Sequence, residues 1–115
     1  REVLEETAFH FTPTALVGIY LSRFLKPASP DEPAEDITYL RFAFTGTLGD
    51  FEPQRQLDEG IVRTLWMGLD EMHATQDKHR SRLLIRCAED HARGQRFPLE
   101  TVYTDRTVFN GGQLR

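Results

Sequence analysis

The chain has 115 residues, of which 39% are hydrophobic and 28% charged, a composition that fits one folded domain and argues against global disorder. No apolar run reaches the roughly 18 residues that a membrane-spanning helix needs. The net charge of −4 argues against a protein that binds nucleic acid polymers, although a divalent cation would let it bind a phosphorylated small molecule.

The first half of the chain predicts one helix followed by two strands. Residues 1–8 contain strong helix formers and no breaker, and residues 9–13 read as a connector because proline disfavours helix at the residue before it. Residues 15–24 and 38–48 alternate in the way that strands do, and we expect the two to be antiparallel neighbours. A loop rich in proline and acidic residues, 25–36, joins them.

The next part of the chain predicts a loop, a third strand and a short helix. Residues 49–60 are polar and contain two glycines, which indicates a loop. Residues 61–67 are expected to form a strand that ends around Trp66. Residues 68–72 are expected to turn into a short helical segment.

One long helix is predicted over residues 81–93. Its apolar stripe is predicted to consist of Leu84, Cys87, Ala88 and His91. Gly94 stands where a left-handed residue commonly ends a helix, and a short extended piece and a glycine-rich tail are expected from residue 96 onward.

Three acidic residues share one face of the first predicted helix. Glu2, Glu5 and Glu6 are spaced i, i+3 and i+4, so their carboxylates repel one another. Arg1 relieves part of that repulsion at Glu5, and a hard divalent cation with oxygen ligands would relieve the rest. Most glutamate-rich helix faces are merely solvated, so the pattern alone leaves both interpretations open.

Residues 1–9 resemble the second half of the Nudix box, G-x5-E-x7-R-E-U-x-E-E-x-G-U, in which U is a bulky apolar residue. Arg1, Glu2, Glu5 and Glu6 match the four charged positions, and Ala8 stands where the pattern has Gly. The first half of the box is not in the sequence, and the chain begins inside a helix without Met or an N-cap residue. We therefore expect further residues upstream of this numbering, and 1–115 to be one N-terminally incomplete domain.

Later segments extend the resemblance over most of the chain. The acidic stretch 57–60, the strand ending around Trp66 and the Leu-Asp-Glu start of the next helix follow in the order found in many Nudix enzymes. Residues 94–100 resemble the C-terminal region of the bacterial phosphatases of the NudJ group within that family. The resemblance implies the fold class, an α/β/α sandwich of Nudix type with a mixed sheet.

The resemblance also implies an activity and the residues that carry it. Glu2, Glu5 and Glu6 would bind Mg²⁺ or Mn²⁺, Glu2 would also be a candidate general base, and Arg1 would orient the carboxylates through an ion pair. The catalytic set is thus Glu2, Glu5 and Arg1. Asp58 and Glu59, in the acidic stretch, would supply further ligands or substrate contacts.

The implied reaction is metal-assisted hydrolysis at phosphorus. The implied substrates are nucleoside di- and triphosphates and related pyrophosphates, including the thiamine-precursor pyrophosphate, with ADP-ribose or another nucleoside diphosphate derivative as the alternative. A catalytically silent Nudix-fold binding module is the alternative of another class. The expected partner is a small molecule rather than a nucleic acid polymer or a membrane, and the protein is expected to be a monomer or homodimer. A cytoplasmic location is expected because the single cysteine cannot form an internal disulfide.

The remaining conspicuous side chains have structural interpretations beside functional ones. Trp66 and the Phe42 and Phe44 pair are expected in the core. Tyr39 and Arg41 are candidates for stacking on a base and for touching a substrate phosphate, or else they occupy a half-buried strand and a solvated sheet edge. The four histidines show no ligand spacing. Arg96 could reach a substrate or hold the C-terminal helix by bonding to backbone carbonyls, and for Gln95 and Arg96 we favour the structural role.

Overall fold

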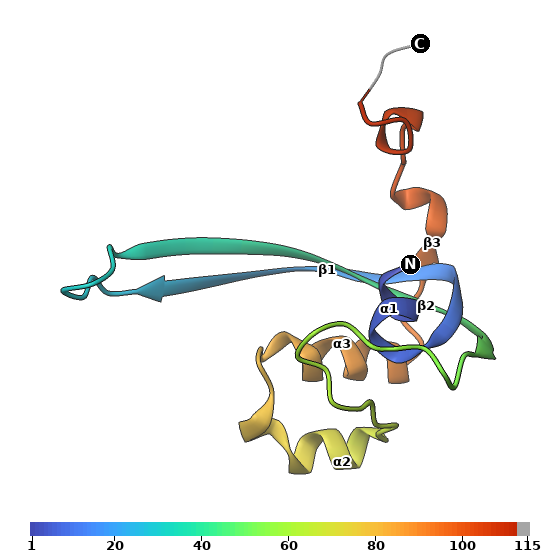
Figure 1. Cartoon of the computed structure of the whole chain (residues 1–115), viewed down its shortest axis with the longest axis horizontal. Coiled ribbons are helices and arrows are strands. Elements are labelled where there is room, and N and C mark those ends of the chain that lie inside the picture. Colours follow the sequence, from blue (N-terminus) through green and yellow to red (C-terminus); the bar gives the residue numbers. More distant parts are fainter. Residues whose placement is uncertain (113–115) are drawn as a thin grey trace.

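A long antiparallel hairpin forms the centre of the computed structural model, which describes residues 1–112 (Figure 1). Strand β1, Phe9–Lys26, pairs with β2, Glu35–Phe51, as the sequence predicted. The short strand β3, Phe97–Pro98, pairs antiparallel with the other edge of β1, which gives the order β2-β1-β3.

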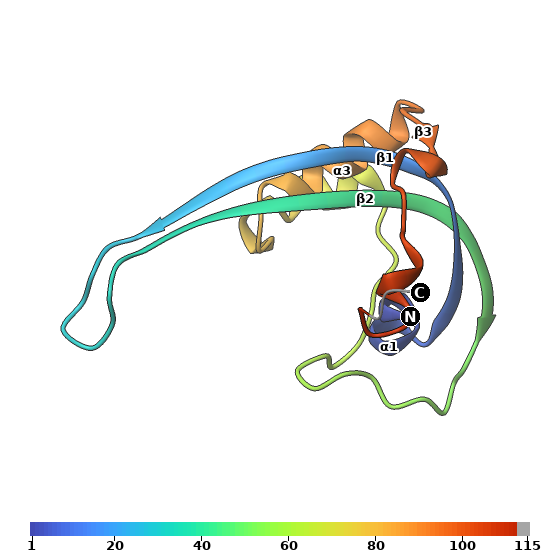
Figure 2. The ribbon, with the colours of Figure 1, turned by 90° about the horizontal axis from the view of Figure 1, so that it is seen from above.

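The helices pack beside this hairpin. Helix α1 is Glu2–Thr7, α2 is Leu69–Ala74 and α3 is Leu83–Ala92. In Figure 1, α3 lies directly below the hairpin and α2 lies below α3, while Figure 2 shows α1 inside the curve of the hairpin. The short 3-10 turns are Gln76–Lys78, Leu99–Thr101 and Arg106–Val108. None of the helices in residues 1–112 is long and apolar enough to cross a membrane.

The hairpin is longer than predicted at both ends near α1. Residues 9–13, expected as a connector, belong to β1, and β2 continues through Phe51 into the segment expected as a loop. Proline has no backbone N–H to donate to a neighbouring strand. Pro13 is tolerated in β1 because the register is irregular between Pro13 and Ala15, where that hydrogen bond is not needed. Opposite lies Gly46, where an added Cβ would sit 2.1 Å from the carbonyl oxygen of Thr12. The glycine therefore permits the close approach of the two strands.

The predicted third strand, residues 61–67, is wrong. That segment is irregular, and neither β1 nor β2 pairs with it. A strand needs a neighbour to satisfy its backbone donors and acceptors, and local alternation cannot supply one. Trp66, expected in the core, is 73% exposed, and its ring meets the edge of Phe9 at a centroid distance of 5.7 Å.

The small core lies between β1 and α3. Leu16 and Val17 are almost fully buried, and Ile85 is the buried apolar residue of α3. The predicted stripe of α3 is therefore rotated, because Leu84 and His91 are exposed while Ile85 and Asp90 face the strands. The predicted helix itself, and the left-handed Gly94 after it, are confirmed.

The second face of the hairpin is apolar and exposed. Ile19 pairs with Phe42 and Leu21 with Leu40, so these side chains share one face, while Tyr20 points to α3 on the other. The expectation that Phe42 and Phe44 lie in the core is wrong: they are 42% and 41% exposed. The sequence correctly predicted that these residues lie on one face of the strand, but none of the described elements covers that face along this part of the hairpin.

Candidate functional site

Helix α1 carries the acidic residues that the sequence singled out. Arg1 lies 3.5 Å from the Glu5 carboxylate, one turn away, and the Thr7 hydroxyl donates to the Val3 carbonyl at 2.6 Å. The helix ends at Ala8, which is buried and left-handed with φ 66°, and whose N–H donates to the Leu4 carbonyl. Glycine adopts a positive φ more readily than alanine because it has no Cβ, so Ala8 occupies a position that suits glycine better.

The three glutamates of α1 differ in exposure. Glu5 is half-buried, whereas Glu2 and Glu6 are exposed, and their carboxylates have no hydrogen-bond or ion-pair partner among residues 1–112. Within the same described part, no three His, Cys, Asp or Glu side chains are gathered as they would be around a metal ion. The three glutamates offer carboxylate oxygens, the ligands that a hard divalent cation prefers. Because Glu2 and Glu6 are exposed, their side chains could turn toward a bound cation.

The segment after β2 is tied to α1 by backbone hydrogen bonds. The N–H of Glu52 donates to the Ala8 carbonyl at 2.8 Å, and the N–H of Asp58 donates to the Glu5 carbonyl at 3.1 Å. The resemblance implied that Asp58 and Glu59 supply further ligands or substrate contacts, and the backbone of Asp58 lies against α1. The side chains of Asp58 and Glu59 are both exposed.

Glu52 anchors this segment a second time. Its carboxylate lies 2.5 Å from His10 Nε2 and 3.3 Å from Arg55, on the exposed side of the hairpin end. The hydrogen bond from His10, and then that from Arg55, lowers the pKa of Glu52 below its usual value. His10 shows no ligand spacing in the sequence, and in the structure it makes this tethering contact.

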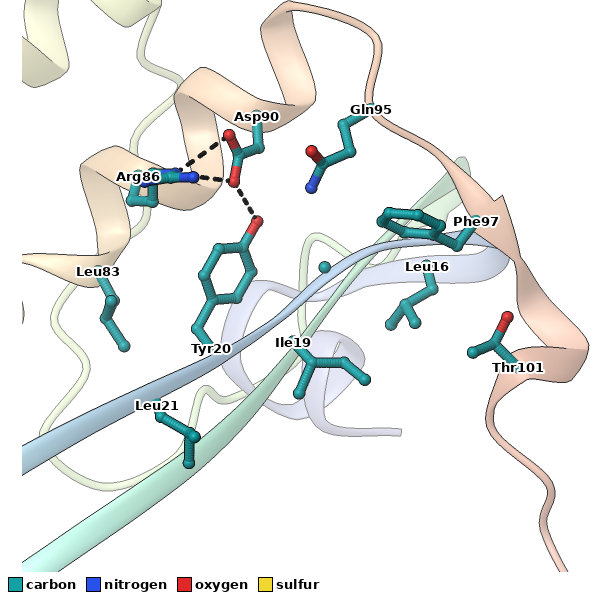
Figure 3. A pocket seen from close by; sticks show the side chains of 11 residues that line it. Leu16, Ile19, Tyr20, Leu21, Leu83, Arg86, Asp90, Gln95, Phe97 and Thr101 are labelled. Atoms are coloured by element: carbon teal, nitrogen blue, oxygen red, sulfur yellow. Dashed lines mark hydrogen bonds and ion pairs between the residues drawn. The ribbon is translucent and has the colours of Figure 1, made fainter.

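An ionic cluster around the buried Asp90 carboxylate joins β1 to α3 (Figure 3). Tyr20 donates its hydroxyl to Asp90 at 2.7 Å, and Arg86 and Arg93 reach the same carboxylate at 3.1 Å and 2.7 Å. The hydrogen bond from Tyr20, together with those from Arg93 and Arg86, lowers the pKa of Asp90 to about 2. Burial, and then the bond to Asp90, raises the pKa of Tyr20. With both its oxygens occupied, Asp90 acts as a fixed anchor for α3.

Sequence reasoning missed this cluster. The only local signal was the spacing of Arg86 and Arg93 four residues before and three after Asp90, which predicts ion pairs along a helix. Tyr20 is 70 residues away in sequence, so its contact could not be foreseen from spacing. Tyr20, Arg86 and Asp90 line a hollow of about 610 Å³ that is otherwise mostly apolar. Figure 3 shows the side chains around it.

Gln95 and Arg96 hold the chain after α3, as the sequence predicted. The Gln95 side-chain N–H donates to the Val17 carbonyl at 2.8 Å, just beyond the two residues of β1 that pair with β3. Arg93 in turn donates to the side-chain amide oxygen of Gln95 at 2.7 Å. Arg96 donates to the His91 and Gln95 backbone carbonyls. All these contacts are structural.

The two remaining candidate substrate contacts, Tyr39 and Arg41, line one hollow between the hairpin and the start of α3. Tyr39 is half exposed, and Arg41 is half-buried. None of the glutamates of α1 lines this hollow or the one beside Asp90. The structure therefore separates the predicted site residues into two groups, one on and beside α1 and one against α3.

Comparison with solved structures finds a match to a structure described as "NUDIX hydrolase from Nitrosomonas europaea". The two chains are 41% identical and superpose with a TM-score of 0.73 over 90% of this chain. The match spans 64% of the length of the other chain, somewhat less than two thirds. No protein-family model and no curated protein matches. The chain has the α/β fold of the matched structure over the shared region, which confirms the expected fold class.

Proposed function

We propose that this chain belongs to a Nudix hydrolase and forms the part of it that binds metal and cleaves a phosphoanhydride bond. The single observation that carries the proposal is α1, a helix that bears Glu2, Glu5 and Glu6 in a chain 41% identical to a NUDIX hydrolase. Helical spacing puts the three on one face. The docked segment at Asp58 supports the same position, because its backbone lies against the helix at Glu5.

Glu2, Glu5 and Glu6 would hold Mg²⁺, or Mn²⁺ in its place. When bound, the cation would supply positive charge to a phosphate and lower the pKa of a water molecule. Arg1, 3.5 Å from Glu5, would orient that carboxylate. Glu2 would accept a proton as general base. The absence of any ion pair at Glu2 and Glu6 within residues 1–112 supports the assignment, because no protein cation competes for these carboxylates.

The substrate would be a nucleoside di- or triphosphate or a related pyrophosphate. The likeness of residues 94–100 to the NudJ phosphatases favours release of phosphate or pyrophosphate from such compounds, including the thiamine-precursor pyrophosphate. ADP-ribose, or another nucleoside diphosphate derivative, is the alternative. Asp58 and Glu59 would contact the metal or substrate from the segment docked on α1. The enzyme would act as a monomer or a homodimer.

The test is phosphate release across a panel of nucleotides and pyrophosphates, with Mg²⁺ and with EDTA. Glu6→Gln keeps the size of the side chain and removes one negative charge, so it should abolish the Mg²⁺-dependent release while leaving unfolding cooperative. Glu35→Gln, at an exposed acid of β2 without an ion pair among the described residues, is the matched control and should keep full release. Turnover at the wild-type level in Glu6→Gln would remove the metal role.

A catalytically silent module that binds a nucleotide is the second candidate. The exposure of Glu2 and Glu6, and the lack of three gathered metal-ligating side chains among residues 1–112, favour it. Against it stands the retention of three repelling carboxylates on α1, which a silent site does not need. Calorimetry with a non-hydrolysable nucleotide separates the two: tight binding without phosphate release under any metal would support the silent module and contradict the enzyme.

A further inference from the structure

A hollow of about 820 Å³ lies between the hairpin and the start of α3, on the face of the sheet that α3 covers. We call it the arginine hollow, because four of the fourteen basic residues of the chain line it. They are Arg23, Arg41, Arg80 and Arg82. Two serines, Ser22 and Ser81, are also among its lining residues. No Asp or Glu is among its lining residues in the part of the chain that the structure describes.

Most of this positive charge is not neutralised. Arg23 forms two hydrogen bonds of 2.8 Å with Asp36 and is occupied. Arg80 and Arg82 are exposed and have no ion pair within residues 1–112. Arg41 is the informative member, because its Nη1 is buried and has no hydrogen-bond acceptor in the described structure. A buried guanidinium nitrogen without an acceptor is costly, so an acceptor from outside the described residues would stabilise it, and an anion would also match its charge.

The protein offers no carboxylate of its own to Arg41. Asp90, the buried acid of α3, already accepts from Tyr20 and from two arginines of its own helix. The neighbouring thiol, Cys87, does not serve as a thiolate, since burial raises its pKa against the opposing effect of the Arg41 guanidinium. An anion for Arg41 must therefore come from outside the described chain. In a chain with a net charge of −4, this concentration of cations is a local exception.

We propose that the arginine hollow binds a phosphate group of a small molecule, independently of any metal on α1. Guanidinium groups donate in a fork that matches two phosphate oxygens, and three of them are available here. Ser22 and Ser81 add hydroxyl donors from β1 and from the turn before α3. The hollow shares no residue with α1, so phosphate binding there stands apart from the hydrolysis proposed above.

The test is calorimetric titration with inorganic pyrophosphate and, separately, inorganic phosphate, in EDTA at low salt. EDTA keeps a metal-bridged phosphate at α1 from contributing. Arg80→Gln and Arg82→Gln are exposed changes that leave the fold intact, and each should weaken binding about tenfold. Arg63→Gln is the matched control, an exposed arginine outside the hollow and without an ion pair in the described structure, and it should bind as the wild type does.

Each outcome separates this proposal from the hydrolase proposal. Glu6→Gln should bind pyrophosphate in EDTA like the wild type even if it releases no phosphate from nucleotides. Absence of binding by the wild type, or equal binding by Arg82→Gln, Arg63→Gln and the wild type, would overturn the arginine hollow as a phosphate site. Displacement of pyrophosphate by equimolar chloride would also overturn the proposal, because it would show non-specific electrostatic attraction rather than a phosphate site.

Discussion

The charge arrangement on α1 can be tested through protein stability, using Glu6→Gln with and without metal. In the folded chain, Glu2 and Glu6 lie one turn apart, exposed, with no cation beside either in the described structure. Glu6 also lies near the C-terminal end of a six-residue helix, where a negative charge opposes the helix dipole. Without metal, the variant should therefore be more stable than the wild type.

The magnitudes have opposite signs in the two conditions. Without metal, the substitution removes an i, i+4 like-charge pair and an unfavourable contact with the helix dipole. Together these raise the free energy of unfolding of the variant by about 0.5 kcal/mol. With Mg²⁺ at roughly ten times its Kd, binding stabilises the wild type by about 1.4 kcal/mol. Loss of one carboxylate weakens binding on the order of tenfold or more, so most of that stabilisation disappears in the variant. The order of stability should reverse when EDTA is replaced by Mg²⁺.

Urea unfolding of both proteins, followed by fluorescence of Trp66 and by circular dichroism, measures the two differences. Glu35→Gln serves again as the control, because it removes an exposed charge away from α1 and should shift equally in both conditions. A wild type that gains no stability from Mg²⁺, or a Glu6→Gln variant that gains as much as the wild type, would refute the metal-binding role of the helix.

Three further predictions concern the scaffold around the sites. Ala8→Gly should leave the free energy of unfolding within about 1 kcal/mol, because relief of the left-handed backbone offsets lost burial and chain entropy, while Ala8→Val should cost more than about 2 kcal/mol by thermal unfolding. Gly46→Ala should destabilise by about 3 kcal/mol in urea, since its Cβ would meet the Thr12 carbonyl oxygen. The pKa of Asp90 is lowered to about 2, first by Tyr20, so its stabilisation is complete above the ordinary value of about 3.9 and is lost as pH falls through about 2. Asp90→Asn should therefore lose less stability than the wild type between about pH 4 and pH 2, as measured by urea unfolding across that range.

Parts of the fold were predictable because local periodicity determined them. The alternation in residues 15–24 and 38–48 identified two strands and the faces of their side chains, and the antiparallel register pairs them as expected. The prediction failed where the outcome depended on a partner. Pro13 suggested a break, but the strand continues past it because Gly46 allows the neighbouring backbone to approach closely.

The candidate site divides in the same way. The spacing of Glu2, Glu5 and Glu6, with the helix formers around them, predicted both α1 and the face its acids share. Their role as metal ligands stays a prediction. Arg41 and Tyr39 were singled out one by one, and only the folded chain places them in one hollow with Arg80 and Arg82.

The sequence by itself determined which residues share a face of each helix or strand, because side-chain direction repeats with the period of the local backbone. Tertiary structure alone decided what lies opposite each face. It joined Tyr20 to Asp90 across 70 residues, tied the segment at Asp58 to α1, and left the Nη1 of Arg41 buried without an acceptor in the described chain. These contacts arise between segments far apart in the sequence, and they depend on how the elements pack rather than on any local pattern.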